Sequence, residues 1–305
     1  PNPKVFTNSL LGVQATGGST AVRSAWEPMR KAGASARTML VSAAAHRWNV
    51  PAASCRATGG TVIHTPTGRV LGYGALAPLA AKEPVPSQVE LKAPTQYRLI
   101  GTSAKRTDLA GKVDGSAVFG IDVHLPGMKI AAVAACPVFG GKLARVDDTK
   151  ARAVSGVRQI VKLDDAVAAI ADHNGAARKG LAALQIQWDE GANAKFSTEV
   201  WAQQLKDASR GRGVSAAKVG NVESALAAAA VKVEAEYWAP NLAHATLEPM
   251  NCTVHWRKTE CEVWLGTQAL ARAHEGVARV TGLPLDKITM HNHLIGGGVG
   301  RPHDV

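Results

Sequence analysis

Long hydrophobic runs are missing from this sequence of 305 residues. No stretch approaches the roughly 18 consecutive apolar residues that a membrane-spanning helix needs. The most apolar run, Ile130 to Ala135, has the length of a buried strand. Aromatic residues are also scarce, at 5%, whereas alanine and glycine are abundant, which favours closely packed helices and tight turns. Because 46% of the residues are apolar and only 19% are charged, a wholly disordered chain is excluded.

Cysteine is rare as well, and none of the four cysteines belongs to a Cys-x-x-Cys pair. This spacing excludes a zinc site or an iron–sulfur cluster built from neighbouring thiolates. Cys252 and Cys261 lie on neighbouring strand-like segments and could pair, but free buried thiols are the simpler expectation. The cysteines leave the cellular compartment undecided.

Acidic residues are outnumbered, with 24 Asp and Glu against 35 Lys and Arg, so the net charge is +11. Such an excess fits nucleic acid, anionic lipid or an anionic cofactor. The basic residues are scattered, however, and their densest cluster is Arg210-Gly211-Arg212. Aromatic residues are not interleaved with them, as binding of single-stranded nucleic acid requires. The pattern therefore favours a phosphate-bearing cofactor or an acidic partner subunit over nucleic acid.

The sequence also lacks an initiator methionine and a signal peptide. It begins at Pro1 and stops at Val305, just after a glycine-rich loop that has not yet led into another element. We expect a piece of a longer polypeptide, in which any export signal would precede Pro1.

The first block predicts a helix, a hairpin and a linker. A loop at Thr16–Thr20 leads into an alanine-rich pattern with one apolar face, which extends to about Val50. Ser19 or Thr20 is placed to cap this helix, and Pro28 is expected to kink or restart it. Beyond it, the sequence predicts a hairpin over Gly60–Leu71, with a turn at Pro66-Thr67-Gly68, and a proline-rich linker over Ala81–Pro94.

The second block, Leu99–Trp188, alternates strands and short helices, which predicts a compact α/β domain. Its expected strands are Ser116–Val123, Lys129–Ala135, Arg158–Leu163 and Ala183–Trp188. Its expected helices are Asp147–Ala153 and Asn174–Leu181.

A polar stretch, Asp189–Lys195, leads into the third block. Helices are expected at Val222–Ala230 and Gln268–Val280. Strands are expected at Val231–Trp238, Met250–His255, Glu262–Leu265 and Lys287–Asn292. The last strand runs directly into Gly296-Gly297-Gly298-Val299-Gly300. Consecutive glycines let backbone N–H groups approach a phosphate or oxo-anion closely, although a plain tight turn is the alternative. Neither a P-loop nor a Rossmann fingerprint is matched.

Six segments carry a specific combination of motifs in a fixed order along nearly the whole chain: Thr16–Ala34, Arg98–Met128, Pro137–Lys142, Ala243–Thr253, Trp264–Gln268 and Gly296–Gly300. In these segments the chain resembles the large, molybdenum-binding subunit of the xanthine dehydrogenase/aldehyde oxidase family. The likeness is to the isoquinoline 1-oxidoreductase beta-subunit type, which includes bacterial membrane-associated aldehyde dehydrogenases. The resemblance implies an α+β, multi-domain fold. Residues 99–188 would form an α/β hammerhead-type domain between two portions of a molybdopterin-binding domain, 1–94 with the linker and 196–305 as its truncated first part.

The resemblance also implies a cofactor and partners. The cofactor is molybdopterin with molybdenum, usually as its cytosine dinucleotide in bacteria. The implied activity hydroxylates an aldehyde or an N-heteroaromatic carbon with oxygen derived from water. Electrons leave through iron–sulfur clusters on a small 2Fe–2S subunit, with a cytochrome c subunit as a further partner.

Candidate site residues follow from the same resemblance. Gln268 would donate from its amide to the apical oxo ligand of molybdenum; the alternative is that it caps the following helix. The backbone of the glycine loop would lie against the cofactor through Gly297, Gly298, Val299 and Gly300. The polar loop would lie near the dinucleotide tail, where hydroxyl and N–H groups suit phosphate, through Thr16, Ser19 and Thr20.

The sequence departs from the family pattern at the glycine loop, where Val299 replaces a Phe and Pro302 replaces an Arg. The catalytic Glu of the family lies downstream of this chain, so no catalytic residue is assigned and the chain alone is expected to be inactive. The alternative is a non-catalytic, degenerate relative that acts as an interaction module or is a pseudogene product.

Two further features receive structural interpretations. Glu248 precedes a proline and is expected to accept backbone N–H bonds. His291, His293 and His303 cluster around the glycine loop, but no carboxylate or cysteine joins them in the sequence. No metal ion held by protein ligands is therefore expected.

Overall fold

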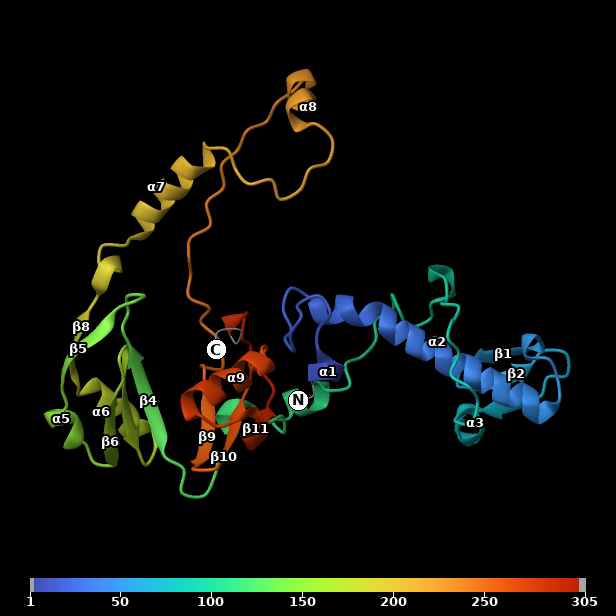
Figure 1. Cartoon of the computed structure of the whole chain (residues 1–305), viewed down its shortest axis with the longest axis horizontal. Coiled ribbons are helices and arrows are strands. Elements are labelled where there is room, and N and C mark those ends of the chain that lie inside the picture. Colours follow the sequence, from blue (N-terminus) through green and yellow to red (C-terminus); the bar gives the residue numbers. More distant parts are fainter. Residues whose placement is uncertain (1–2, 302–305) are drawn as a thin grey trace. The chain divides into compact units, whose positions relative to one another are not determined.

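The computed structural model describes residues 3–301 and combines helices with several small sheets (Figure 1). The α+β class expected from the sequence is confirmed. The chain divides into two compact units, one formed by Pro1–Val123 with His244–Val305 and the other by His124–Ala243. Among the described residues, no helix is both long and apolar enough to cross a membrane.

A short helix, α1 (Pro3–Phe6), precedes the long helix α2 (Thr20–Trp48). The expected restart at Pro28 is wrong, because α2 continues through this residue as one helix. A single missing N–H is tolerated within 29 residues that are otherwise rich in helix-forming alanine. The expected side-chain cap is also wrong. Ser19 occupies the N-cap position in a left-handed conformation without a capping bond, and the Thr20 hydroxyl donates instead to the Gly17 carbonyl at 2.6 Å.

The hairpin predicted from the sequence is confirmed, and helix α2 packs on it. Strands β1 (Cys55–Thr58), β2 (Thr61–His64) and β3 (Val70–Gly72) form an antiparallel sheet, and α3 (Tyr73–Ala80) follows it. The core of this part consists of small and branched side chains: Ala43, Ala44, Val62, Leu76 and Ala80.

The proline-rich segment contains no helix or strand over 81–93, as expected of a linker. It lies along α2 because side chains of the helix hold it. Arg30 and Arg37 donate to the carbonyl oxygens of Lys92 and Glu90 at 2.8 and 2.6 Å. It ends at a single 3-10 turn, η2 (Pro94–Gln96).

The expected strand at Ser116–Val123 is wrong. The segment instead follows a short helix, α4 (Leu109–Val113), and contains a 3-10 turn, η3 (Gly120–Asp122). The turn forms because the Asp122 carboxylate accepts the backbone N–H of Phe119 at 2.9 Å, which closes the chain on itself.

The second unit holds the β-rich part of the second block. Strand β7 (Ala166–Ala171) lies between β4 (Ile130–Ala135) and β6 (Val157–Lys162), with both neighbours antiparallel. A separate antiparallel pair joins β5 (Lys142–Asp147) to β8 (Gln185–Asp189). Short helices connect these strands, α5 (Thr149–Arg152) and α6 (Asn174–Ala182). The strands β5 and β7 were not among the segments expected, whereas both helices are confirmed.

The rest of this unit is exposed. A helix that the sequence pattern did not indicate, α7 (Thr198–Ser209), is followed by the predicted helix α8 (Val222–Ala228). The strand expected at Val231–Trp238 is absent, although apolar and polar residues alternate there. In the described chain no strand lies beside this segment, and a strand requires a neighbour to pair its backbone groups.

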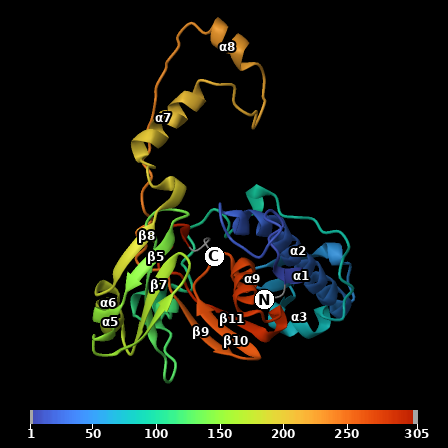
Figure 2. The same cartoon turned by 60° about the vertical axis from the view of Figure 1, so that its left-hand side comes forward.

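The part of the third block that follows residue 243 forms a mixed sheet within the first unit. Strand β10 (Glu260–Leu265) pairs antiparallel with β9 (Cys252–Arg257) and parallel with β11 (Ile288–Asn292). Helix α9 (Leu270–Thr281) connects the two parallel strands and lies against the sheet, as both views show (Figures 1 and 2). The core of this part consists of Cys261, Val263 and Ile288. The strands and the helix predicted for this region are confirmed.

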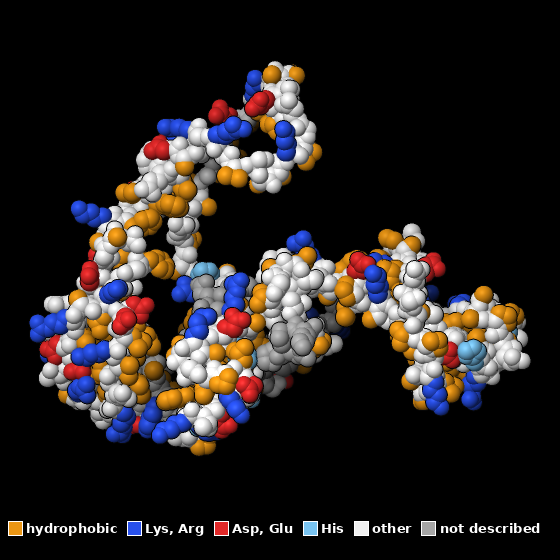
Figure 3. Space-filling model, viewed as in Figure 1, with side chains coloured by type: hydrophobic (Ala, Val, Ile, Leu, Met, Phe, Trp, Pro, Cys, Tyr) orange, Lys and Arg blue, Asp and Glu red, His pale blue; other side chains and the backbone are white. Residues whose placement is uncertain are grey.

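The expectation of free buried thiols is met by Cys261 but is wrong for Cys252, which is free and exposed. Cys252 is opposite Leu265 and Cys261 is opposite Trp256, so the two thiols do not face each other, and both are free. Figure 3 shows Lys and Arg side chains dispersed over the drawn face and mixed with Asp and Glu. No continuous basic stripe is visible on that face.

Candidate functional site

The candidate site lies at the carboxyl ends of the parallel strands β10 and β11. Because α9 returns the chain to the start of β11, both strands point the same way and their following loops meet at one edge of the sheet. The loop after β10 contains Gln268, and the loop after β11 contains the glycine run. Open sheets of parallel strands bind ligands at this edge.

Direct hydrogen bonds hold the two loops together. The backbone N–H of His293 donates to the Leu265 carbonyl at 2.8 Å. The backbone N–H of Thr267 donates to the Asn292 side-chain oxygen at 3.0 Å. Two segments that the sequence marked separately therefore form one continuous structure.

Gln268 also connects to the polar loop near the N-terminus. Its amide nitrogen donates to the Thr16 carbonyl at 3.1 Å, and the backbone N–H of Thr16 donates to the Gln268 carbonyl at 2.9 Å. The alternative of a helix cap is wrong, because the N-cap of α9 is Ala269 and it receives no side-chain cap. One amide N–H of Gln268 is used by Thr16, and the other is not bonded within the described chain.

The three candidate residues of the polar loop differ in accessibility. Thr16 and Ser19 are exposed, whereas Thr20 is buried at 8% exposure. The Thr20 hydroxyl accepts a bond from the Asn8 amide at 3.0 Å and donates to Gly17. The structure thus brings Thr16 to Gln268, while Thr20 holds the loop together from inside. The roles of all three residues toward a cofactor remain predictions.

The glycine loop adopts a backbone that presents N–H groups. Gly297, Val299 and Gly300 have positive φ angles of 83°, 49° and 92°, and Gly298 between them does not. Val299 and Gly300, both at positive φ, close a tight turn in which the backbone N–H of Arg301 donates to the Gly298 carbonyl at 2.8 Å. A tight turn was the alternative expectation, and binding of an anion by these N–H groups stays a prediction. Val299 is 74% exposed and is strained, because a β-branched residue rarely adopts a positive φ. Within residues 3–301, the N–H groups of 297–300 bond to no acceptor.

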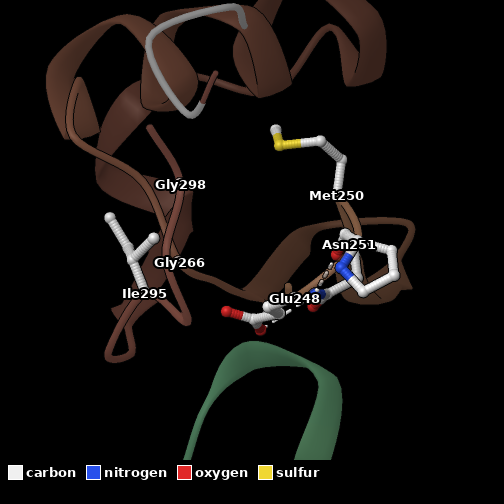
Figure 4. A pocket seen from close by; sticks show the side chains of 7 residues that line it. Glu248, Met250, Asn251, Gly266, Ile295 and Gly298 are labelled. Atoms are coloured by element: carbon white, nitrogen blue, oxygen red, sulfur yellow. Dashed lines mark hydrogen bonds between the residues drawn. The ribbon is translucent and has the colours of Figure 1, made fainter. Parts of the chain in front are cut away.

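A small hollow borders this loop (Figure 4). It is lined by Glu248, Pro249, Met250, Asn251, Gly266, Ile295 and Gly298. Glu248 accepts backbone N–H groups from Gly296 and Ile121, as its position before proline indicated. Asn251 is a site residue that the sequence pattern did not indicate. Its side-chain amide donates to the Glu248 carboxylate at 3.0 Å. The signal that the sequence offered is its position three residues after Glu248.

The histidine cluster has a different arrangement from the one expected. His291 stacks on Trp264 with ring centroids 4.8 Å apart, and the Glu262 carboxylate lies 3.4 Å from its Nε2. The expectation that no carboxylate joins the cluster is therefore wrong, because the sheet brings Glu262 from the neighbouring strand. Arg257, together with His291, lowers the pKa of Glu262.

No group of metal-ligating side chains large enough for a metal site occurs among the described residues. His303 and Pro302 lie outside that range.

Comparisons with known proteins agree with this geometry. Residues 206–302 match the model of the molybdopterin cofactor-binding domain. The chain is 31% identical to isoquinoline 1-oxidoreductase subunit beta of Brevundimonas diminuta, over 98% of this chain and 44% of that protein. It is 28% identical to a membrane-bound aldehyde dehydrogenase of Gluconacetobacter polyoxogenes, over 97% of this chain and 40% of that protein. The chain thus spans less than half the length of these relatives.

Solved structures show a weaker likeness. The Cu,Mo-CO dehydrogenase has a TM-score of 0.46 and 18% identity, covering 65% of this chain and 31% of that one. Quinoline 2-oxidoreductase from Pseudomonas putida 86 has a TM-score of 0.46 and 15% identity, covering 65% and 30%.

The β10–β11 pair, with the loops at its edge, lies within residues 206–302, the segment that matches the molybdopterin cofactor-binding domain. Over 98% of its length the chain is similar to isoquinoline 1-oxidoreductase subunit beta, in line with the resemblance to molybdenum-binding large subunits of the xanthine dehydrogenase/aldehyde oxidase family. The residues present fit this cofactor. Backbone N–H groups at 297–300, which bond to no acceptor within residues 3–301, and a neutral amide donor suit anionic oxygens.

Proposed function

We propose that this chain carries the cofactor-facing part of a molybdopterin-dependent oxidoreductase that acts on an aldehyde or an N-heteroaromatic substrate. The observation that carries the proposal is the convergence of Gln268, Thr16 and the glycine loop at one edge of the β10–β11 pair. When bound, the cofactor supplies two-electron redox chemistry and oxygen transfer. The chain's own residues bind and orient it.

The roles divide according to the chemistry of each group. The N–H groups of Gly297, Gly298, Val299 and Gly300 would bind anionic oxygens of the cofactor. The second amide N–H of Gln268 would donate to it, while the bond to Thr16 fixes the orientation of the amide. The hydroxyls of Thr16 and Ser19 would face the phosphates of the dinucleotide, which we propose to be the cytosine form.

Three further parts of the proposal follow the family pattern. Residues 99–188 would form the hammerhead-type domain, with 1–94 and 196–305 as portions of the cofactor domain. The catalytic base would come from sequence beyond this chain, so the 305 residues alone should not turn over substrate. Electrons would leave to a small 2Fe–2S subunit, with a cytochrome c subunit as a further acceptor.

The test compares Gln268→Ala with the wild type in the full-length protein that contains this chain. Removing one hydrogen bond to the cofactor should reduce transition-state stabilisation by about 1–3 kcal/mol, with molybdenum content largely retained. Gln203→Ala is the matched control, because Gln203 lies on α7 and bonds only to Asp207 within the described chain. An unchanged rate in Gln268→Ala would overturn the assignment of Gln268.

A second candidate is a non-catalytic relative, which the strained Val299 favours. This candidate predicts a wild-type protein without molybdenum and without pterin. Metal analysis and pterin fluorescence of the purified full-length protein separate the two candidates. A stoichiometric content of both supports the oxidoreductase.

A further inference from the structure

A single carboxylate connects three segments of the first unit around the glycine loop. One oxygen of Glu248, Oε2, accepts the backbone N–H of Gly296 at 2.6 Å. The other, Oε1, accepts the backbone N–H of Ile121 at 3.1 Å and the Asn251 amide at 3.0 Å. The backbone N–H of Glu248 donates in return to the Gly296 carbonyl at 3.0 Å. Residues 248 and 296 are therefore bonded in both directions.

The approach of these segments is as close as glycine permits. A Cβ at Gly296 would lie 2.7 Å from the Cβ of Glu248, and a Cβ at Gly120 would lie 2.7 Å from the Oδ1 of Asn251. Both distances are shorter than side-chain carbon contacts allow. The start of the glycine loop and the turn η3 are thus seated directly on Glu248 and Asn251.

The carboxylate is held by neutral donors. No Lys or Arg within residues 3–301 forms an ion pair with Glu248. Its negative charge is therefore stabilised by N–H groups alone, and hydrogen bonds to a charged acceptor are stronger than bonds between neutral groups. Replacing one carboxylate oxygen by an amide NH2 would set a donor against one of these N–H donors.

We infer that Glu248 is a positioning residue for the cofactor-facing loop, an inference that rests on the proposed function. Because the carboxylate accepts the backbone N–H of Gly296, this N–H cannot donate to a ligand. The same bond anchors the first residue of the loop. The donors presented to a ligand then begin at Gly297, where the φ angle becomes positive. Glu248 itself does not need to touch the cofactor or substrate.

The experiment uses three variants of the full-length protein. Glu248→Gln removes the charge at nearly constant size, and Glu248→Asp keeps the charge on a side chain one methylene shorter. Glu260→Gln is the control, because Glu260 pairs with Arg257 on the same sheet and forms no hydrogen bond or ion pair with the loop within the described chain. For each variant we would measure molybdenum and pterin per folded polypeptide, together with hydrogen exchange of peptides covering 118–124, 130–189 and 292–301.

In Glu248→Gln, molybdenum and pterin should fall about tenfold, and exchange should accelerate at 118–124 and 292–301 but not at 130–189. Glu248→Asp should recover part of the cofactor content, and Glu260→Gln should match the wild type. Wild-type content and wild-type exchange at 292–301 in Glu248→Gln would overturn the inference. A wild type without molybdenum would instead overturn the proposed function, while the exchange measurement would still test the anchoring of the loop. If Glu248→Gln does not fold, the Asp variant and its exchange decide the question.

Discussion

Gln268 and Thr16 are 252 positions apart in the sequence, yet they exchange two hydrogen bonds at the edge of the β10–β11 pair. This contact fixes the plane of the Gln268 amide, which a free side chain on a loop would not maintain. Glu248 has the same effect on the backbone of the glycine loop. At the scale of single residues, the candidate site is therefore a set of neutral donors oriented by their neighbours.

Asp172 shows the strongest effect of charge on a single residue in the second unit. Arg158 forms a two-pronged ion pair with it, and Lys129 approaches to 2.7 Å. These cations, Arg158 first, hold the pKa of Asp172 well below its usual value. A depressed carboxyl pKa contributes stability above the unfolded pKa of about 3.9, and this contribution is lost as the pH falls through the folded pKa.

Asp172→Asn should therefore lower the melting temperature at pH 7, and its difference from the wild type should shrink steadily below about pH 4. Asp164→Asn is the control, because Asp164 has no ion pair in the described chain. Thermal unfolding followed by circular dichroism at several pH values measures both. A difference that persists unchanged into strong acid would contradict the assignment.

At the scale of elements, close packing of small residues joins α6 to the sheet of the second unit. Gly180 on α6 faces Val157 and Ala169, and a Cβ added at Gly180 would lie 2.6 Å from a Val157 methyl. The β-branched Val157 has little rotamer freedom with which to move away. The gain in helix propensity from alanine, about 1 kcal/mol, is smaller than the cost of overpacking.

We expect Gly180→Ala to lower the free energy of unfolding by about 1–3 kcal/mol. Gly33→Ala in α2 is the matched control: a Cβ there meets no atom within 4 Å, so this variant should gain about 1 kcal/mol. Urea denaturation of both variants provides the comparison. Equal stabilisation by the two substitutions would show that α6 does not pack as described.

At the scale of the whole molecule, segments of the chain differ in how far secondary structure protects their backbone. Residues 229–251 contain neither helix nor strand, and large apolar side chains there are exposed, including Val233 at 90% and Tyr237 at 92%. Unpaired backbone of this kind is cut first by proteases. The strands of residues 130–189, in contrast, pair with one another.

Limited trypsin digestion of the chain should therefore begin at Arg212, Lys218 or Lys232, and the segment 130–189 should persist as a larger product. Mass spectrometry of the earliest fragments identifies the sites. Early cuts at Arg145 in β5, or at Arg158 or Lys162 in β6, would contradict the described arrangement.

Local patterns predicted the elements that carry their own signals. The alternation in β10, the apolar face of α9 and the strand that ends in glycine all appear where the sequence indicated them. The same reasoning failed at Val231–Trp238, because alternation permits a strand but only a neighbouring strand makes one. It failed at Ser116–Val123 because the Asp122 carboxylate closes a turn instead.

The sequence by itself determined the α+β class, the similarity to molybdenum-binding subunits and the list of candidate residues, since each depends on residue types in a fixed order. Only the tertiary structure decided which of these residues meet. The bonds of Gln268 to Thr16, of Glu248 to Gly296 and Ile121, and of Glu262 to His291 join positions far apart along the chain. Such contacts depend on the crossover that brings β10 and β11 parallel, and no local pattern contains that information.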